Sequence, residues 1–234
     1  MFEKTHWSVV MTAADLNSPG ATVAFAKLYQ SYSYPLYAFI RRRGHSHHQA
    51  EDLAQGFFAR LLDKNSLKNI SVEGGKFRSY LLTLLKHFLA NERERDCAQM
   101  RGGGKPPLSI DDKADETRYA CEPADESTPE TLFERRWAMA LLDQVMEGLR
   151  ADYTATGDGE LFAALQGHLT GAEDLVPYAK LGAGFGMSEG AVKAAMHRLK
   201  KRYKKLLLAE IAATVSSPEE VEEEIRHLIS VGSR

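Results

Sequence analysis

Apolar residues recur along this chain with the spacing of α-helices. Large apolar side chains return every three or four residues, which places them on one face of a helix. No segment alternates apolar and polar residues convincingly, as a half-buried strand would. We therefore expect an all-α protein. The predicted helices cover residues 21–43, 49–63, 77–99, a segment from 131 to a turn at 154–159, 160–169, two helices within 178–208, and 218–231, with Pro35 expected to kink or split the first.

A long polar stretch divides this helical pattern into two parts. Arg101-Gly-Gly-Gly-Lys-Pro-Pro107 stops regular structure, and an acidic sequence that contains proline continues to about Pro129. We therefore expect two helical domains joined by an acidic linker. The predicted parts are a lead-in at 1–20, a first domain at 21–100, the linker at 101–130, a second domain at 131–213 and an acidic C-terminal helix at 214–234.

The segment Tyr178–Leu208 combines a tight turn with a strongly basic helix. A short apolar helix ends in Gly-Met-Ser, and Ser188 stands where an N-cap residue would satisfy a free backbone N–H of the next helix. That helix has an apolar side, which we expect to be buried, and a basic side. The apolar side holds Val192, Met196, Leu199, Tyr203 and Leu206, and the basic side holds Lys193, His197, Arg198, Lys200, Lys201, Lys204 and Lys205. This layout is typical of a helix-turn-helix that reads DNA.

Charge is segregated along the chain although its sum is small. The 234 residues carry a formal net charge of −2, so any affinity for nucleic acid must come from local patches. Basic residues cluster at Arg41–Arg43 and at Lys193–Lys205, and acidic residues cluster at 111–134 and 219–224. This distribution suggests two basic working surfaces joined by an acidic connector.

Several classes of protein are disfavoured by the composition. Cys97 and Cys121 lack the spacing of a zinc site or of a disulfide scaffold, which favours reduced thiols in a cytoplasmic protein. The start of the chain has no signal-peptide pattern, and no apolar stretch is long enough to span a bilayer, so we expect no membrane partner. No nucleophile–base pair, P-loop or dinucleotide fingerprint occurs, so we expect no catalytic residue and no cofactor.

His45, His47 and His48 raise the alternative of a metal-dependent enzyme. We expect them to lie in a surface loop with no acid or cysteine at ligand spacing, so the sequence predicts no metal site.

Three blocks of sequence, taken together, resemble the bacterial RNA polymerase sigma factors of the extracytoplasmic-function type, a subgroup related to sigma-70. The first block, Ala50-Glu-Asp-Leu-Ala-Gln-Gly-Phe-Phe58, resembles the helix of region 2.2 that binds the clamp helices of the polymerase β′ subunit. Helical spacing places Glu51, Asp52 and Gln55 on one face, which we expect to be exposed. The resemblance implies that these three residues bind polymerase.

The second block begins at Phe77-Arg-Ser-Tyr-Leu and resembles the start of regions 2.3 and 2.4, which meet the melted −10 element. Tyr80 stands where the family usually has Trp, and Phe77 is expected in the core. Aromatic and cationic groups on one surface suit unpaired bases and their phosphates. The resemblance implies −10 contacts by Lys76, Arg78, Tyr80, Lys86, His87 and Asn91.

The third block, Gly186-Met-Ser-Glu-Gly-Ala-Val-Lys193, resembles the motif of region 4.2 that reads the −35 element. Ala191 replaces a family Thr, and Gly182 and Gly184 are expected to weaken the preceding helix. The resemblance implies −35 contacts by Ser188, Glu189, Lys193, Ala194, His197, Arg198 and Lys201.

Taken as a whole, the resemblance implies a promoter-reading subunit that catalyses nothing itself. Its partners would be core RNA polymerase, through the β′ clamp helices and the β flap, and promoter DNA. The segment Arg150–Pro177 is longer than the family's usual connection, so it could either pack a small extra helix or dock a regulatory protein. The alternative is a stand-alone helix-turn-helix regulator, which would account for Tyr178–Leu208 but not for the first two blocks.

Overall fold

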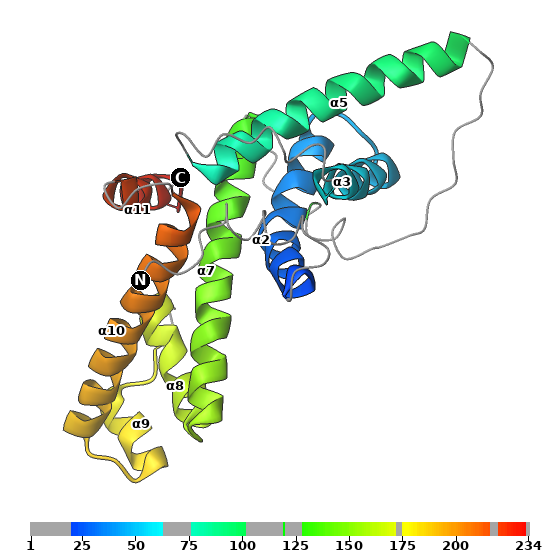
Figure 1. The fold of residues 1–234 in the computed structure, drawn as a ribbon. Helices are drawn as coiled ribbons and strands as arrows, with labels where there is room; N and C mark the ends of the chain where they lie inside the picture. The colour runs from blue at the N-terminus through cyan, green and yellow to red at the C-terminus, as the bar shows by residue number, and fades with distance from the viewer. Residues whose placement is uncertain are drawn as a thin grey trace. The chain divides into compact units, whose positions relative to one another are not determined.

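The protein is all-α in the computed structural model, which describes residues 20–62, 76–101, 119, 128–171, 175–215 and 220–232 (Figure 1). No strand occurs within these ranges, in agreement with the predicted fold class. The helices are α2 (Ala21–Arg42), α3 (His47–Leu62), α5 (Phe77–Arg101), α7 (Pro129–Ala155), α8 (Gly159–Thr170), α9 (Tyr178–Phe185), α10 (Glu189–Thr214) and α11 (Glu220–Gly232).

Side-chain caps fix where several helices begin. Thr128 accepts a hydrogen bond from the backbone N–H of Thr131 at 3.2 Å, and Pro129 occupies the first position of α7, two residues before the predicted start. Ser46 and Gln49 form a reciprocal pair, in which each side chain accepts from the other residue's backbone N–H, at 3.4 and 3.0 Å. This capping box starts α3 two residues before the predicted position.

The helix α2 is continuous across Pro35, so of the two outcomes expected at this residue, a kink or a split, the split is wrong. Pro35 is buried, and the residues on either side of it, from Tyr34 to Ile40, are buried as well. Packing on this scale stabilises a helix that lacks one backbone hydrogen bond.

The contacts divide the chain into two compact units. Unit 1 comprises Met1–Ala140 and Ile211–Arg234, and unit 2 comprises Leu141–Glu210. The divisions therefore fall inside α7 and α10, whereas the sequence suggests boundaries near residues 130 and 213. Most of the predicted linker at 101–130 lies outside the described residues.

The core of unit 1 is rich in aromatic side chains. Tyr32 of α2 meets Phe77 of α5 at a ring-centroid distance of 5.5 Å, and Phe39 of α2 meets Phe133 of α7 at 6.5 Å. Trp137 of α7 is also fully buried. The first turns of α7 thus complete this core, and the prediction that Phe77 is a core residue is confirmed.

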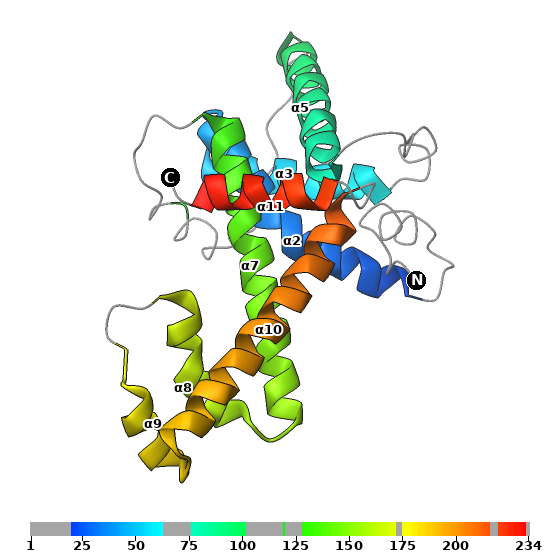
Figure 2. The same cartoon turned by 90° about the vertical axis from the view of Figure 1, so that its left-hand side faces the viewer.

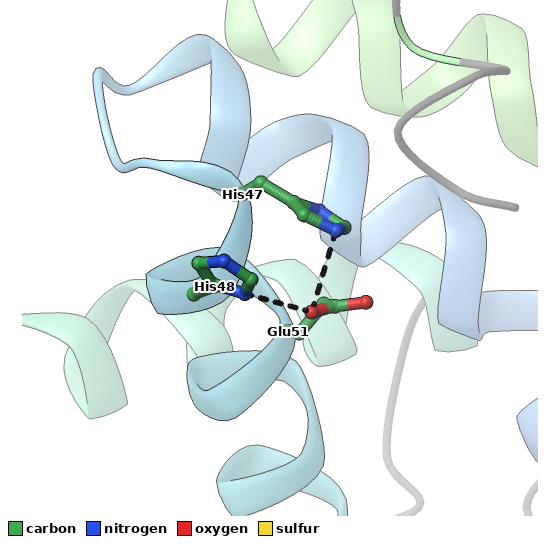
Figure 3. A group of neighbouring side chains, drawn as sticks. All are labelled: His47, His48 and Glu51. Carbon is green, nitrogen blue, oxygen red and sulfur yellow. Dashed lines mark ion pairs between the residues drawn. The ribbon is translucent and has the colours of Figure 1, made fainter. Parts of the chain in front are cut away.

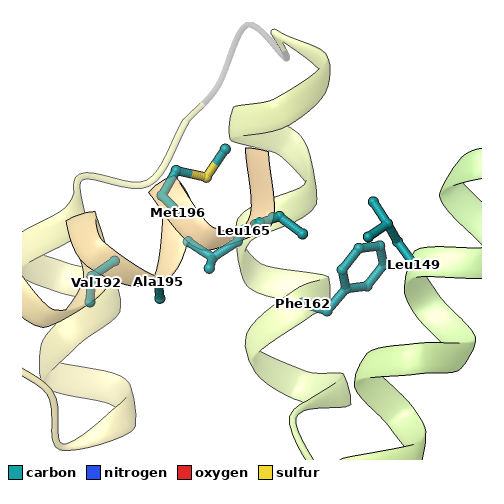
Figure 4. Packing of buried hydrophobic residues seen from close by; sticks show 7 residues of the cluster. Leu149, Phe162, Leu165, Val192, Ala195 and Met196 are labelled. Carbon is teal, nitrogen blue, oxygen red and sulfur yellow. The ribbon is translucent and has the colours of Figure 1, made fainter. Parts of the chain in front are cut away.

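Unit 2 has a separate apolar core at the meeting of α7, α8 and α10 (Figure 4). Leu149 of α7 and Phe162 and Leu165 of α8 are buried with the apolar side of α10. The segment 150–177 therefore contributes a helix whose apolar side chains help hold α10 in place.

None of the described helices combines the length and the apolar character needed to cross a membrane.

Candidate nucleic-acid interface

The turn between α9 and α10 is closed by two glycines. Gly186 ends α9 in the left-handed conformation, with φ of 64°, which glycine adopts without steric cost. Gly182 accepts a hydrogen bond from the N–H of Met187 at 2.8 Å, and a Cβ on Gly182 would lie 2.4 Å from the Met187 carbonyl oxygen. Gly182 is thus required for this tight turn, whereas the sequence suggests only that it weakens α9.

Ser188 caps α10 as predicted. Ser188 directly precedes the helix, which begins at Glu189, and its Oγ accepts a hydrogen bond from the N–H of Ala191 at 3.2 Å. The first turn of α10 therefore starts at a fixed position after the glycine turn.

The two sides of α10 differ sharply. Val192, Met196 and Leu199 are buried in the core of unit 2, and Tyr203 and Leu206 are partly buried against it, as the spacing predicts. The residues proposed for −35 contacts all lie exposed on the opposite side: Ser188, Glu189, Lys193, Ala194, His197, Arg198 and Lys201. They form one continuous surface, which we call the basic face of α10, together with Lys200, Lys204 and Lys205.

Few acids neutralise the basic face of α10. Lys193 pairs with Glu189 one turn earlier at 2.6 Å, and this hydrogen bond and charge raise the pKa of the Lys193 ammonium. Arg202, beside the face, pairs with Asp152 at 2.9 Å and lies over the ring of Tyr153. Over the described residues, Arg198, Lys200, Lys201, Lys204 and Lys205 form no ion pair with an acid. The surface is thus available to a polyanion.

The residues proposed for −10 contacts do not share one surface. Tyr80, His87 and Asn91 follow one side of α5, where His87 and Asn91 are exposed and Tyr80 is half-buried, which raises the pKa of its phenol. Arg78 and Lys86 point to a different side, toward the start of α7. Lys86 pairs there with Glu130 at 2.8 Å, and this contact lowers the pKa of the Glu130 carboxyl.

Arg78 is buried, with 2% of its surface exposed. Its Nε donates to Glu134 of α7 at 2.5 Å, its Nη1 pairs with Glu224 of α11, and the guanidinium lies 4.5 Å from the ring centroid of Trp137. In this arrangement Arg78 does not face solvent, in contrast to the sequence-based expectation of a DNA contact.

Lys76 also meets the C-terminal helix. Its Nζ lies 3.1 Å from an oxygen of Glu223 and 3.1 Å from an oxygen of Glu224. His227 of α11 completes the contact by bonding the same Glu134 oxygen that accepts from Arg78, at 2.8 Å. Figure 2 shows α11 crossing α7 beside the start of α5, all within unit 1.

The three residues of α3 that are proposed to bind polymerase differ in burial. Asp52 and Gln55 are exposed, as predicted, but Glu51 is buried at 7% exposure, so the prediction that it shares an exposed face is wrong. Its carboxylate oxygen lies 3.6 Å from Nε2 of His47 and 3.8 Å from Nδ1 of His48 (Figure 3).

His47, His48 and Glu51 are also a group that could hold a metal ion. One ligand atom from each lies within 4.8 Å of the others, and the Tyr37 hydroxyl lies 2.9 Å from Nδ1 of His47, in hydrogen-bond contact. His45 lies in the loop before α3, as predicted, but the prediction of a loop with no acid at ligand spacing is wrong for His47 and His48. Because the capping box starts α3 at His47, Glu51 falls one helical turn after the two histidines.

The fold of α2, α3 and α5 can be compared with known families. Residues 28–96 match the family model Sigma-70 region 2. The match supports a protein of the sigma-70 family, with a sigma-factor-like role in RNA polymerase binding and promoter melting. It covers α3 and the greater part of α2 and α5, and leaves α7 to α11 unassigned. No curated protein and no solved structure matches the chain.

Sequence reasoning missed the acids that contact the proposed −10 cations. Glu130 and Glu134 stand in the acidic region at 111–134, which the sequence assigns to the linker and the start of a helix, and Glu223 and Glu224 stand in the acidic cluster at 219–224. The Ser46-to-Gln49 spacing was a usable signal for the start of α3, whereas no local signal links α11 to α5.

Proposed function

We propose that this protein is a sigma factor that binds core RNA polymerase and directs promoter recognition and transcription initiation through −10 and −35 contacts. It belongs, in this proposal, to the extracytoplasmic-function type. The Sigma-70 region 2 match over 28–96 carries the proposal, because it covers the helices proposed to hold both polymerase and the melted strand.

The polymerase contact is proposed for the exposed side of α3. Asp52 and Gln55 present a carboxylate and an amide to solvent, whose oxygens can accept hydrogen bonds from arginine side chains of the β′ clamp helices. Glu51 acts indirectly in this proposal, because its contacts with His47 and His48 help to fix the first turns of α3.

The melted −10 strand is proposed to run along α5. Tyr80 offers a partly exposed ring for stacking, and His87 and Asn91 offer polar groups on the same side. Capture of unpaired bases offsets the few kcal/mol that unstacking costs at each step, so binding would favour the open duplex.

The −35 element is proposed to bind α10, the second helix of a helix-turn-helix formed with α9. The exposed start of α10 would enter the major groove, where the exposed side chains of Lys193 and Arg198 would reach base edges or phosphates. Catalysis is not part of the proposal, and a contact with the β flap remains an expectation from the family.

Transcription with purified core polymerase tests the proposal. We expect the full-length chain to confer defined start sites on core polymerase acting on a genomic DNA library, as read by sequencing of the transcripts. The double variant Asp52→Ala/Gln55→Ala should lower the affinity for core polymerase by about tenfold or more if both contacts are made.

The matched control is Asp143→Ala, which removes an exposed acid from α7. It should leave polymerase affinity unchanged. A chain that binds duplex DNA but never core polymerase would instead be the stand-alone regulator.

A further inference from the structure

We propose that α11 is an internal competitor for the melted DNA strand, whose carboxylates occupy the cationic corner formed by Lys76 and Arg78. The proposal rests on the function proposed above and adds a means of regulating that site. It concerns unit 1 alone, in which α5, the start of α7 and α11 all lie.

The contact is specific in its geometry. Glu224 is fully buried and reaches both Lys76 and Arg78, while Glu223 adds a second carboxylate to Lys76 at 3.1 Å. His227 ties the same helix to Glu134. Two acids of α11 thus meet two cations that are separated by a single residue, Phe77, where α5 begins.

The chemistry of the contact matches that of a nucleic-acid backbone. A carboxylate and a phosphate both accept charge-assisted hydrogen bonds from ammonium and guanidinium groups. The described part of α11 carries four glutamates against one arginine, so it presents negative charge. A strand that runs along Tyr80, His87 and Asn91 would bring its phosphates toward the start of α5, where α11 lies.

Replacement of the Glu224 carboxylate by a phosphate costs less free energy than departure of α11 with nothing in its place. Departure of α11 alone would take Glu224 away from Arg78 and leave Glu134 as the acid that pairs with this buried charge, which is a net loss unless another anion takes the place of Glu224. A phosphate can take the place of Glu224, while Glu134 and the Trp137 ring continue to hold the guanidinium. Release of α11 and capture of the strand are therefore coupled, and α11 raises the threshold for binding DNA.

Single-stranded DNA binding tests the proposal directly. The probe is a fluorescein-labelled single-stranded oligonucleotide of mixed sequence, titrated with the full-length protein at low salt. We expect Glu223→Gln/Glu224→Gln to bind the probe about tenfold more tightly than the unmodified chain, because about one phosphate contact is freed.

Two further variants separate this effect from a general change of charge. Glu222→Gln removes one carboxylate at an exposed position of the same helix, which forms no ion pair with Lys76 or Arg78 in the described part of the chain, and it should shift affinity by less than about twofold. Adding Lys76→Ala to the double glutamine variant should reduce the gain, since one of the two freed cations would be missing. Equal gains for Glu222→Gln and the double variant, or a gain that Lys76→Ala leaves unchanged, would overturn the proposal.

A measurement on the unmodified protein tests the same proposal without relying on a variant that folds. Hydrogen exchange of the amides at 220–232 should accelerate when the oligonucleotide is added, because the strand displaces α11. Unchanged exchange at saturating oligonucleotide would also overturn the proposal.

The two proposals fail in different ways. If the chain does not bind core polymerase, the sigma-factor function fails, whatever the oligonucleotide does. If it directs initiation normally but the double variant gains no affinity for the strand, only the competitor role of α11 fails.

Discussion

Gly182 shows how one missing side chain can shape a binding surface. The carbonyl of Met187 approaches its Cα so closely that a Cβ would lie 2.4 Å away, a distance that folded proteins essentially never show. The turn that follows sets the position of Ser188, and Ser188 sets the start of α10. The placement of the basic face of α10 thus depends on the absence of a Cβ atom at Gly182.

Replacing Gly182 with Ala should therefore destabilise the protein. We expect a loss of about 1–3 kcal/mol, typical of overpacking against rigid backbone, measured by denaturant unfolding. The matched control is Gly184→Ala in the same helix, where the new Cβ meets nothing within 4 Å. That control should stabilise by roughly 0.5–1 kcal/mol, because alanine favours helix. Equal effects of the two changes would contradict this account of the turn.

At the residue scale, local features could be predicted and long-range ones could not. The cap at Ser188 follows from a serine just before a helical pattern, and the structure confirms it. The burial of Glu51 follows from packing around α3 and from two histidines one turn earlier, and the polar character of the residue alone suggested exposure. Arg78 is a similar case, since its partners lie 56 residues away or more.

Between elements, ion pairs connect α5 to the start of α7. Lys86 meets Glu130, and Arg78 meets Glu134 one helical turn farther along α7. The two contacts differ in burial, because Lys86 and Glu130 are 40% and 45% exposed whereas Arg78 is almost fully covered. The exposed pair therefore contributes little, below about 1 kcal/mol, and it is the one whose titration can be followed.

The Glu130 contact should make a small, acid-sensitive contribution to stability. Lys86 lowers the pKa of Glu130 below its ordinary value of 4.5, so the contribution is present above that pH and is lost as the pH falls through the lowered pKa. In Lys86→Met the Glu130 carboxyl should titrate nearer its ordinary value, as followed by NMR of the side-chain carboxyl carbon. Lys200→Met, which removes a lysine from α10, should leave that titration unchanged. A Glu130 curve unaffected by Lys86→Met would exclude the contact in solution.

The extent of each helix was largely predictable, whereas its packing partners were not. The apolar spacing that begins at Phe77 and at Thr131 places α5 and α7 to within a few residues, because helix formation follows local periodicity and capping. That Phe133 and Trp137 complete a core with α2 and α5 could not be read from the sequence, since many apolar faces are compatible with one another. The acidic run at the start of α11 was visible too, without any sign of Lys76 as its counterpart.

At the scale of the whole molecule, a chain of net charge −2 concentrates its exposed cations on α10. Affinity for duplex DNA should therefore come from this one helix and fall steeply with salt. The polymerase contact proposed on α3 uses other residues, so the two activities should be separable by substitution.

Arg198→Ala should weaken binding to a cognate −35 duplex by about 1–3 kcal/mol if the guanidinium reads a base. Affinity for core polymerase should be unchanged, and Asp52→Ala/Gln55→Ala should give the reverse pattern. Fluorescence anisotropy at several salt concentrations distinguishes the kinds of contact, because loss of a phosphate contact weakens all sequences equally and reduces the salt slope by about one. Equal loss of both activities in both variants would argue against separate surfaces.

The stacking of Arg78 on Trp137 gives the protein a built-in optical probe. The chain has two tryptophans, Trp7 and Trp137, so Trp7→Phe would leave the indole beneath Arg78 as the sole source of tryptophan emission. Departure of α11 would admit water beside that ring and shift its emission to longer wavelength. The position of α11 could then be followed in real time by the fluorescence of Trp137, without any attached dye.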